Sequence, residues 1–108
     1  MASFNDFANL DIRVGRIVEA EDLEGARKPI YRLKIDLGEL GIKNIAAGIK
    51  EFYTKEQLLG KSVVVLANLE PKSIAGFVSE GMMLAADDGT NVCLLIPDRE
   101  MQPGSRIR

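Results

Sequence analysis

The chain contains no histidine and no tryptophan, and it has a single cysteine, Cys93. The lack of histidine removes the commonest general base, the Ser–His and Cys–His nucleophile pairs and most zinc sites. One cysteine can form neither an intramolecular disulfide nor a CxxC metal knuckle. Because Cys93 stands among apolar neighbours with no adjacent cation, we expect a buried small side chain rather than a reactive thiol. These absences favour a binding module over an enzyme.

Long hydrophobic runs are also missing. The N-terminus has no basic region followed by an apolar one, so it does not resemble a signal peptide. The longest apolar run covers residues 63–67, whereas a membrane helix needs about 20 residues. The sequence therefore predicts a cytoplasmic protein without a membrane partner.

No large charge of one sign is present either. Among 108 residues there are 14 Lys and Arg and 16 Asp and Glu, so the net charge is −2. This balance excludes a polybasic protein that binds polyanions through total charge, but it permits a local basic patch. The length predicts one domain over residues 1–108, because domains cluster around 100–150 residues.

The N-terminus carries the signature of a short helix. Ser3 and Asp6 have the spacing of a capping box, and Phe4, Phe7 and Leu10 form one apolar stripe over about two turns. So short a helix cannot bury both phenylalanines against itself. We expect them to pack on the domain or on a partner chain.

The rest of the chain alternates with a period of two. Strands are predicted near residues 12–17, 31–37, 42–47, 62–67, 82–86 and 92–96. Residues 19–25 and 69–79 are predicted to be loops, residues 87–91 a hairpin turn, and a short helix capped by Thr54 follows the third strand. Gly15 inside the first strand indicates a bulge or bend.

This order of elements predicts an all-β fold, a five-stranded Greek-key barrel of the oligonucleotide/oligosaccharide-binding (OB) type. A short helix lies between strands three and four, with a short N-terminal helix and a C-terminal extension. An SH3-like barrel is the alternative, although it would not need the helix.

Basic residues recur at positions that an OB barrel brings to one side. They are Arg27, Lys28, Arg32, Lys34, Lys43 and Lys72. Several exposed cations along a groove suit a phosphate backbone, although ordinary solvated strand faces are an alternative. Tyr31 is predicted to point into the barrel, which leaves Phe77 as the one exposed ring. Recognition by backbone shape and 2′-hydroxyls is therefore favoured over stacking of single strands.

The segment after the long predicted loop offers polar ligands. Ser79 could donate to a phosphate or ribose, and Glu80 could accept from a base amino group or a ribose hydroxyl. The alternatives are that Ser79 binds its own loop backbone and that Met82 belongs to the core. Gly81 indicates an unusual conformation or a close backbone approach. Residues 87–89 predict a plain turn, because a calcium loop needs further spaced oxygen ligands.

Five segments, in order, resemble the OB-fold tRNA-binding domain. They are DIRVGRI at 11–17, KN with AGI at 43–49, NLEPK at 68–72, GFVSEGM at 76–82 and LIPD at 95–98. That domain is appended to many methionyl-tRNA synthetases and also occurs in free-standing tRNA-binding proteins and in the CsaA secretion chaperone. Residues 26–29 and 41–43 are similar to CsaA, whereas Asn44, Gly48 and residues 81–88 are similar to the synthetase domain.

The resemblance implies a homodimer, with Phe4 and Phe7 of the N-terminal helix in its interface. It also implies binding of tRNA by shape, with no catalysis, cofactor or metal, and the methionyl-tRNA synthetase catalytic chain as a possible partner. No Gly-rich phosphate loop for a nucleotide is present. The RNA-binding residues it suggests, together with the basic pattern, are Arg27, Lys28, Lys34, Lys43, Asn44, Lys72, Ser79, Glu80 and Met82. Two alternatives are a CsaA-like export chaperone that binds unfolded polypeptide and a structural adaptor that docks onto a synthetase.

Overall fold

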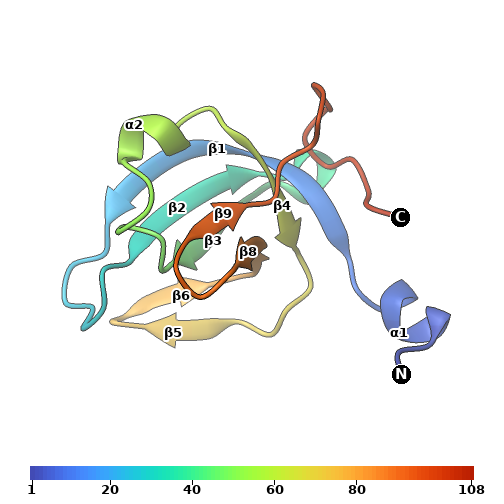
Figure 1. Ribbon diagram of the computed structural model, residues 1–108, viewed down its shortest axis with the longest axis horizontal. Coiled ribbons are helices and arrows are strands. Elements are labelled where there is room, and N and C mark those ends of the chain that lie inside the picture. The colour runs from blue at the N-terminus through green and yellow to red at the C-terminus, as the bar shows by residue number, and fades with distance from the viewer.

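A five-stranded antiparallel sheet in the order β3-β2-β1-β4-β7 forms the body of the protein. The computed structural model describes all 108 residues. The strands are β1 (Ile12–Asp22), β2 (Tyr31–Asp36), β3 (Ile42–Ala47), β4 (Ser62–Leu66) and β7 (Met82–Met83). The sheet curls so that its edge strands β3 and β7 approach each other (Figure 1). The predicted five-stranded barrel is therefore confirmed.

Strand β1 is long enough to serve two neighbours. Residues 12–16 pair with β4, and residues 16–22 pair with β2. The register shifts between Ile17 and Glu19, so Val18 forms a bulge and both Val18 and Glu19 are exposed. The prediction of a loop from residue 19 is thus wrong for residues 19–22, which continue the strand.

Gly15 does not form the bulge that was predicted for it. A Cβ at this position would lie 2.5 Å from Ile35 Cγ2 and 2.8 Å from Leu37 Cδ2. Glycine is required because the backbone of β1 lies directly against the fully buried side chains of Ile35 and Leu37. The bend of the strand comes from the bulge at Val18 instead.

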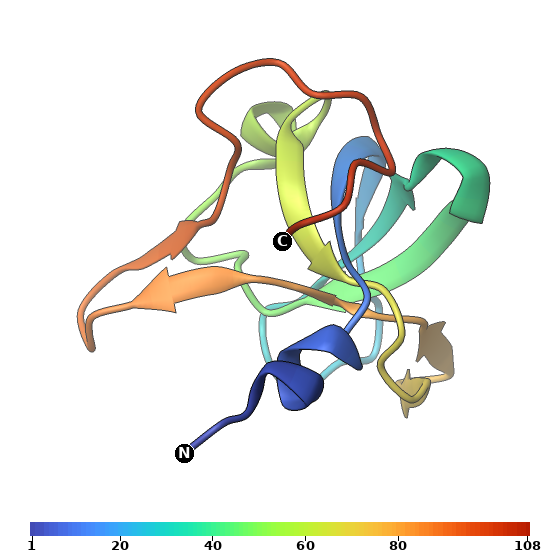
Figure 2. The ribbon, with the colours of Figure 1, turned by 90° about the vertical axis from the view of Figure 1, so that its right-hand side faces the viewer.

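The two α-helices are short and capped as predicted. Helix α1 (Phe4–Ala8) has a capping box from Ser3 and Asp6, and α2 (Lys55–Leu58) has one from Thr54 and Gln57. A 3-10 turn, η1 (Gly38–Leu40), joins β2 to β3. Helix α2 lies between β3 and β4 and buries Leu58, whereas α1 has no buried residue and stands apart from the barrel (Figures 1 and 2).

Two hairpins form separate two-stranded sheets. The first, β5 (Lys72–Ile74) and β6 (Phe77–Ser79), occupies the segment predicted to be a loop. Its two-residue turn is Ala75–Gly76, and both residues have positive φ, as a type I′ turn requires. The second, β8 (Ala85–Asp87) and β9 (Val92–Leu94), projects as an arm (Figure 2). The predicted strand 82–86 is therefore divided between β7 and β8, while the hairpin turn after it is confirmed.

The core is made of apolar side chains from the inner face of the barrel. Tyr31, Leu33 and Ile35 of β2 are buried in alternation with exposed Arg32 and Lys34. The inward direction predicted for Tyr31 is confirmed, and its hydroxyl donates to the carbonyl of Tyr53 at 2.7 Å. Cys93 is exposed, contrary to expectation, because it alternates outward between half-buried Val92 and buried Leu94 on β9.

The C-terminal extension runs along the first half of β1. The Val14 N–H donates to Ser105 O at 2.8 Å, and the Ile107 N–H donates to Ile12 O at 2.9 Å. Buried Arg13 donates to the Asp11 carboxylate at 2.6 Å and to Gly104 O at 3.0 Å. The hydrogen bond to Asp11 is the main reason that the pKa of the Arg13 guanidinium is raised. Arg13 thus fastens the extension to the barrel.

No helix of the structure is long and apolar enough to cross a membrane.

Candidate nucleic-acid interface

Ser79 and Glu80 close the barrel along the free edge of β3. Ser79 Oγ accepts from the Ala46 N–H at 2.9 Å and donates to Gly81 O at 3.2 Å. Glu80 Oε1 accepts from the Asn44 N–H at 2.9 Å, while the Glu80 N–H donates to Asn44 O at 2.8 Å. Side-chain oxygens therefore replace the carbonyls of a missing neighbour strand. The backbone role weighed for Ser79 is present, and its hydroxyl is buried.

Gly81 and Met82 follow this seam directly. A Cβ on Gly81 would lie 2.8 Å from Leu66 O, so the glycine permits close approach to β4. Its conformation is not the unusual one that was the other possibility, because its φ is not positive. Met82 is 44% exposed, which places it outside the core and available to a ligand.

The outer face of β1, β2 and β3 carries a row of polar side chains. The register pairs Glu19 with Lys34 and Lys34 with Asn44, so the three side chains share one face. Arg32 lies on the same face, two residues along β2, and both cations of β2 are exposed. Glu19 enters this row because of the bulge at Val18, which the alternation of the sequence did not reveal.

Lys43 does not belong to this face. It pairs with Ile35, which is fully buried, and it shares its side of β3 with buried Ile45. Lys43 therefore departs from the expected convergence of six cations, because its side chain lies on the opposite side of β3 from Asn44. Its position follows from alternation along the strand.

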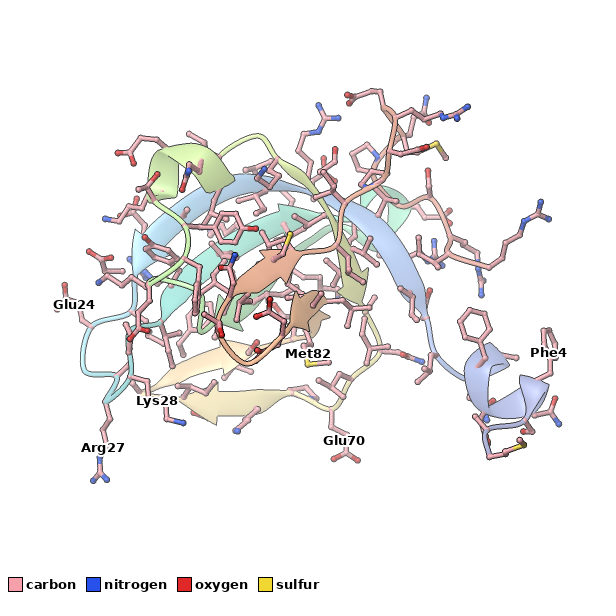
Figure 3. The ribbon with its side chains drawn as sticks, viewed as in Figure 1. Phe4, Glu24, Arg27, Lys28, Glu70 and Met82 are labelled. Atoms are coloured by element: carbon pink, nitrogen blue, oxygen red, sulfur yellow. The ribbon has the colours of Figure 1, made fainter.

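A groove brings three further cations together. It has a volume of about 620 Å³ and separates the β1–β2 connection from β5. Its charged lining residues are Arg27, Lys28 and Lys72. Arg27 and Lys28 lie at the end of the molecule farthest from Phe4 of α1 (Figure 3).

The cations of the groove and of β2, which are Arg27, Lys28, Arg32, Lys34 and Lys72, form no ion pair within the chain. They share this property with Lys43, Lys61, Arg106 and Arg108, which line neither the groove nor the pocket beside β2. By contrast, other basic residues are neutralised internally. They include Arg13 with Asp11, Arg16 with Glu100, and both Lys50 and Lys55 with Asp22. The free cations are therefore available to an external polyanion.

The Asp22 cluster fixes α2 to the end of β1. Lys50 Nζ lies 2.9 Å from Asp22 Oδ1, and Lys55 Nζ lies 3.1 Å from Asp22 Oδ2. The contact with Lys50, and after it the contact with Lys55, lowers the pKa of Asp22. The same contact with Asp22 raises the pKa of Lys55. This cluster is structural, and its two lysines are already paired with the Asp22 carboxylate.

The turn at residues 87–91 is held by its own backbone. Asp88 Oδ1 accepts from the Asn91 N–H at 2.7 Å and from the Thr90 N–H at 2.9 Å, and these bonds lower the pKa of Asp88. The carboxylate therefore acts as a turn residue, as predicted. Nowhere do three His, Cys, Asp or Glu side chains gather as a metal site would require.

Beside the row of polar side chains lies a pocket of about 280 Å³. Its lining residues are Glu19, Arg32, Leu33, Lys34, Asn44 and Phe77. Phe77 reaches it from β6, which contacts β3, and its ring is half-buried. The prediction that Phe77 is the one exposed ring is wrong, because Phe4, Phe7 and Phe52 are all exposed, but Phe77 does lie beside the basic face.

Comparison with known proteins decides the family. The family model described as "Putative tRNA binding domain" matches residues 12–106. The chain belongs to this tRNA-binding domain family. The resemblance drawn from the five sequence segments is confirmed.

Relatives extend this assignment. The chain is 50% identical over 105 residues to methionine–tRNA ligase of Pyrococcus horikoshii, covering 97% of the chain but 14% of the ligase. It is 51% identical over 106 residues to the enzyme of Methanosarcina acetivorans, covering 97% of the chain and 15% of that ligase. The tRNA-binding domain thus corresponds to a small part of these enzymes.

Solved structures share the whole fold. The CsaA chaperone protein of Picrophilus torridus superimposes with a TM-score of 0.94 at 44% identity, covering 100% of both chains. A MetRS related protein of Pyrococcus horikoshii superimposes with a TM-score of 0.90 at 28% identity, covering 100% of this chain and 98% of the other. Both branches expected from the sequence, synthetase-related and CsaA, are therefore present among the structural neighbours.

Proposed function

We propose that this tRNA-binding domain holds tRNA on the outer face of β2 and in the groove between the β1–β2 connection and β5, without catalysing a reaction. The observation that carries the proposal is the set of unpaired cations on that side: Arg27, Lys28, Arg32, Lys34 and Lys72. Cations that a fold leaves without internal partners are the ones that can replace counterions on a phosphate backbone.

The overall charge of −2 supports a local interface. Because the molecule as a whole is slightly acidic, attraction is confined to the basic side and the RNA is held in one orientation. The contacts are to phosphates, which carry little sequence information. Recognition therefore depends on the shape of the tRNA, with Asn44 beside the cations of β2 and exposed Met82 of β7 as a further contact.

The test is equilibrium binding to bulk tRNA over a series of salt concentrations. We expect Lys72→Met to lower affinity for all tRNAs alike and to reduce the salt slope by about 1. Lys61→Met removes the same charge just before β4, outside both the groove and the pocket, and serves as the matched control. Equal losses in the two variants would show that net charge alone governs binding and would refute the proposed interface.

Lys34 and Lys43 provide an internal comparison, because they occupy opposite sides of the sheet. If the outer face of β2 contacts the RNA, Lys34→Met weakens binding more than Lys43→Met. A larger loss from Lys43→Met would place the RNA at the start of β3 instead. Arg27→Met and Lys28→Met test the loop in the same assay.

We also propose that two copies associate through the stripe on α1. Phe4, Phe7 and Leu10 are 80%, 40% and 43% exposed, and nothing in the chain covers them. Because α1 and the basic loop lie at opposite ends of the molecule (Figure 3), dimerisation leaves both basic surfaces open. Sedimentation equilibrium should give a dimer for the wild type and a monomer for the double variant Phe4→Ser, Phe7→Ser. A monomeric wild type would refute this arrangement.

We further propose that the domain assists methionyl-tRNA synthetase by raising the local concentration of tRNA at the catalytic chain, in the cytoplasm where tRNA is charged. Addition of the protein to a synthetase catalytic chain should lower KM for tRNA and leave kcat unchanged. An unchanged KM would refute assistance in trans.

A second function, binding of unfolded polypeptide, is favoured by the close similarity to CsaA. It predicts suppression of aggregation of a denatured client with little dependence on salt, because burial of apolar surface is not screened. Salt-sensitive tRNA binding without such suppression would favour the first function.

A further inference from the structure

The pocket between β1, β2, β3 and β6 contains a carboxylate, an amide and an aromatic ring in addition to the cations that phosphate binding needs. Glu19, Arg32, Lys34 and Asn44 line it, and none of the four side chains forms a hydrogen bond or ion pair within the chain. Glu19 and Lys34 are register partners on neighbouring strands, and yet they do not form an ion pair. The pocket therefore presents donors and acceptors that have no partner within the chain and are open to a ligand.

The Glu19 carboxylate indicates which part of an RNA can enter the pocket. A carboxylate among the cations of a phosphate-binding surface repels phosphates and weakens binding of the backbone. It can accept from an exocyclic amino group of a base, as acidic side chains do in nucleic-acid recognition. Glu19 thus suits an uncharged base with an amino group rather than another phosphate.

Phe77 supplies the second half of a base site. Unpaired bases in RNA are bound by stacking on aromatic rings and by hydrogen bonds to their edges. The ring lies at the start of β6 next to a tight turn, and Ser79, two residues later, is anchored to Ala46 of β3. Because the strand is fixed at that point, the backbone that carries the ring is positioned before a ligand arrives, which reduces the entropy lost on binding.

We propose that this pocket takes one unpaired nucleobase of the bound RNA, stacked on Phe77 with its amino group donating to Glu19. The proposal rests on the tRNA binding proposed above and adds a base-specific contact to it. Arg32 and Lys34 lie beside the base and neutralise the phosphate attached to it. Adenine, cytosine and guanine carry an exocyclic amino group, whereas uracil presents carbonyl oxygens at the corresponding positions. The pocket therefore discriminates against uridine.

The experiment compares tRNA with a blunt RNA duplex, and A6 and C6 with U6 single strands. The wild type should bind A6 and C6 at least about 5-fold more tightly than U6. Phe77→Leu should weaken tRNA binding by about 5- to 150-fold, the range of one base–aromatic stack, with an unchanged salt slope and unchanged duplex binding. Phe77→Tyr keeps a ring and should restore most of the affinity, which separates stacking from folding defects. Phe52→Leu, at a ring beside α2, is the matched control.

Glu19→Gln gives opposite changes in two measurements. Loss of the negative charge should tighten binding of the duplex, because a repulsion of phosphates is removed. The same change should reduce the preference for A6 and C6 over U6, because the amide oxygen is a weaker acceptor than a carboxylate and the new amide N–H groups can donate to the carbonyl oxygens of uracil. A purely electrostatic role of Glu19 would give the first change without the second and would overturn the proposal.

The outcomes separate the two levels of inference. If the wild type fails to bind tRNA even at low salt, the proposed function is refuted. If the wild type binds tRNA with a strong salt dependence but Phe77→Leu binds it equally well, the base pocket is refuted and the phosphate interface stands. Equal affinity of the wild type for A6 and U6 would also refute the contact with Glu19.

Discussion

Replacement of Ser79 by alanine separates a structural hydroxyl from a ligand-binding one. The hydroxyl accepts from Ala46 N at 2.9 Å and donates to Gly81 O at 3.2 Å, and it is 6% exposed as a residue. Alanine leaves the Ala46 N–H at the barrel seam without an acceptor. An unsatisfied buried donor costs about 1–3 kcal/mol. A domain of this size loses about 4–8 °C of Tm per kcal/mol, so we expect Ser79→Ala to unfold roughly 4–24 °C below the wild type.

The assay is thermal unfolding at neutral pH, paired with tRNA binding well below the transition. We expect the variant to be destabilised but to bind tRNA within about 2-fold of the wild type, since a stability change of this kind barely alters the folded fraction at low temperature. Ser73→Ala, on the exposed face of the same hairpin, is the control and should leave Tm unchanged. If Ser79→Ala left Tm unchanged but lowered tRNA affinity about 10-fold, the structural role of the Ser79 hydroxyl in closing the barrel would be refuted. Ser79 would then be a ligand-binding residue.

Three further changes test other parts of the fold. Gly15→Ala places a Cβ 2.5 Å from Ile35 Cγ2. The overpacking should lower the free energy of unfolding by about 1–3 kcal/mol, which is measured as a lower urea midpoint. An unchanged midpoint would contradict the close contact between Gly15 and the Ile35 side chain. Ala75→Gly removes the side chain from a residue at φ 50° in the β5–β6 turn and so relieves backbone strain. The free energy of unfolding should rise by about 0.5–1 kcal/mol, which is measured as a higher urea midpoint. A lower midpoint would mean that the turn is not strained. Asp22→Asn should lower stability at pH 7, and this deficit relative to the wild type should shrink as the pH falls below the ordinary carboxyl value of 3.8. The sign follows from the lowered pKa of Asp22, which stabilises the folded state only while the carboxylate is ionised; a deficit that does not change between pH 7 and pH 2 would argue against the ion pairs.

The base pocket and the seam are linked through β6. Ser79 anchors the end of the strand whose first residue, Phe77, stands in the pocket. Any loss of tRNA affinity in Ser79→Ala beyond about 2-fold should therefore come from stacking and should leave the salt slope of binding unchanged.

Much of the barrel could be predicted from local pattern. Alternation in residues 31–37 predicted β2, with Tyr31 inward and Lys34 outward, because a strand places successive side chains on opposite faces. The two capping boxes predicted the starts of α1 and α2, since their hydrogen bonds join residues three apart. The order of these elements was sufficient for the OB barrel, and the ordered segments were sufficient for the family.

The sequence by itself thus determined the positions of most strands of the barrel, the facing of β2 and the family, whereas the tertiary structure decided which side chains meet. The bulge at Val18 depends on the pairing of β1 with β4 in its first half and with β2 in its second half. Only the shifted register after the bulge places Glu19 opposite Lys34. Ser79 and Glu80 read as ligand residues in the sequence, but the free edge of β3 uses their oxygens to close the barrel. The physical reason is the same in each case: strand register and hydrogen bonds between residues 15 or more positions apart depend on the closure of the whole sheet, on which local alternation carries no information.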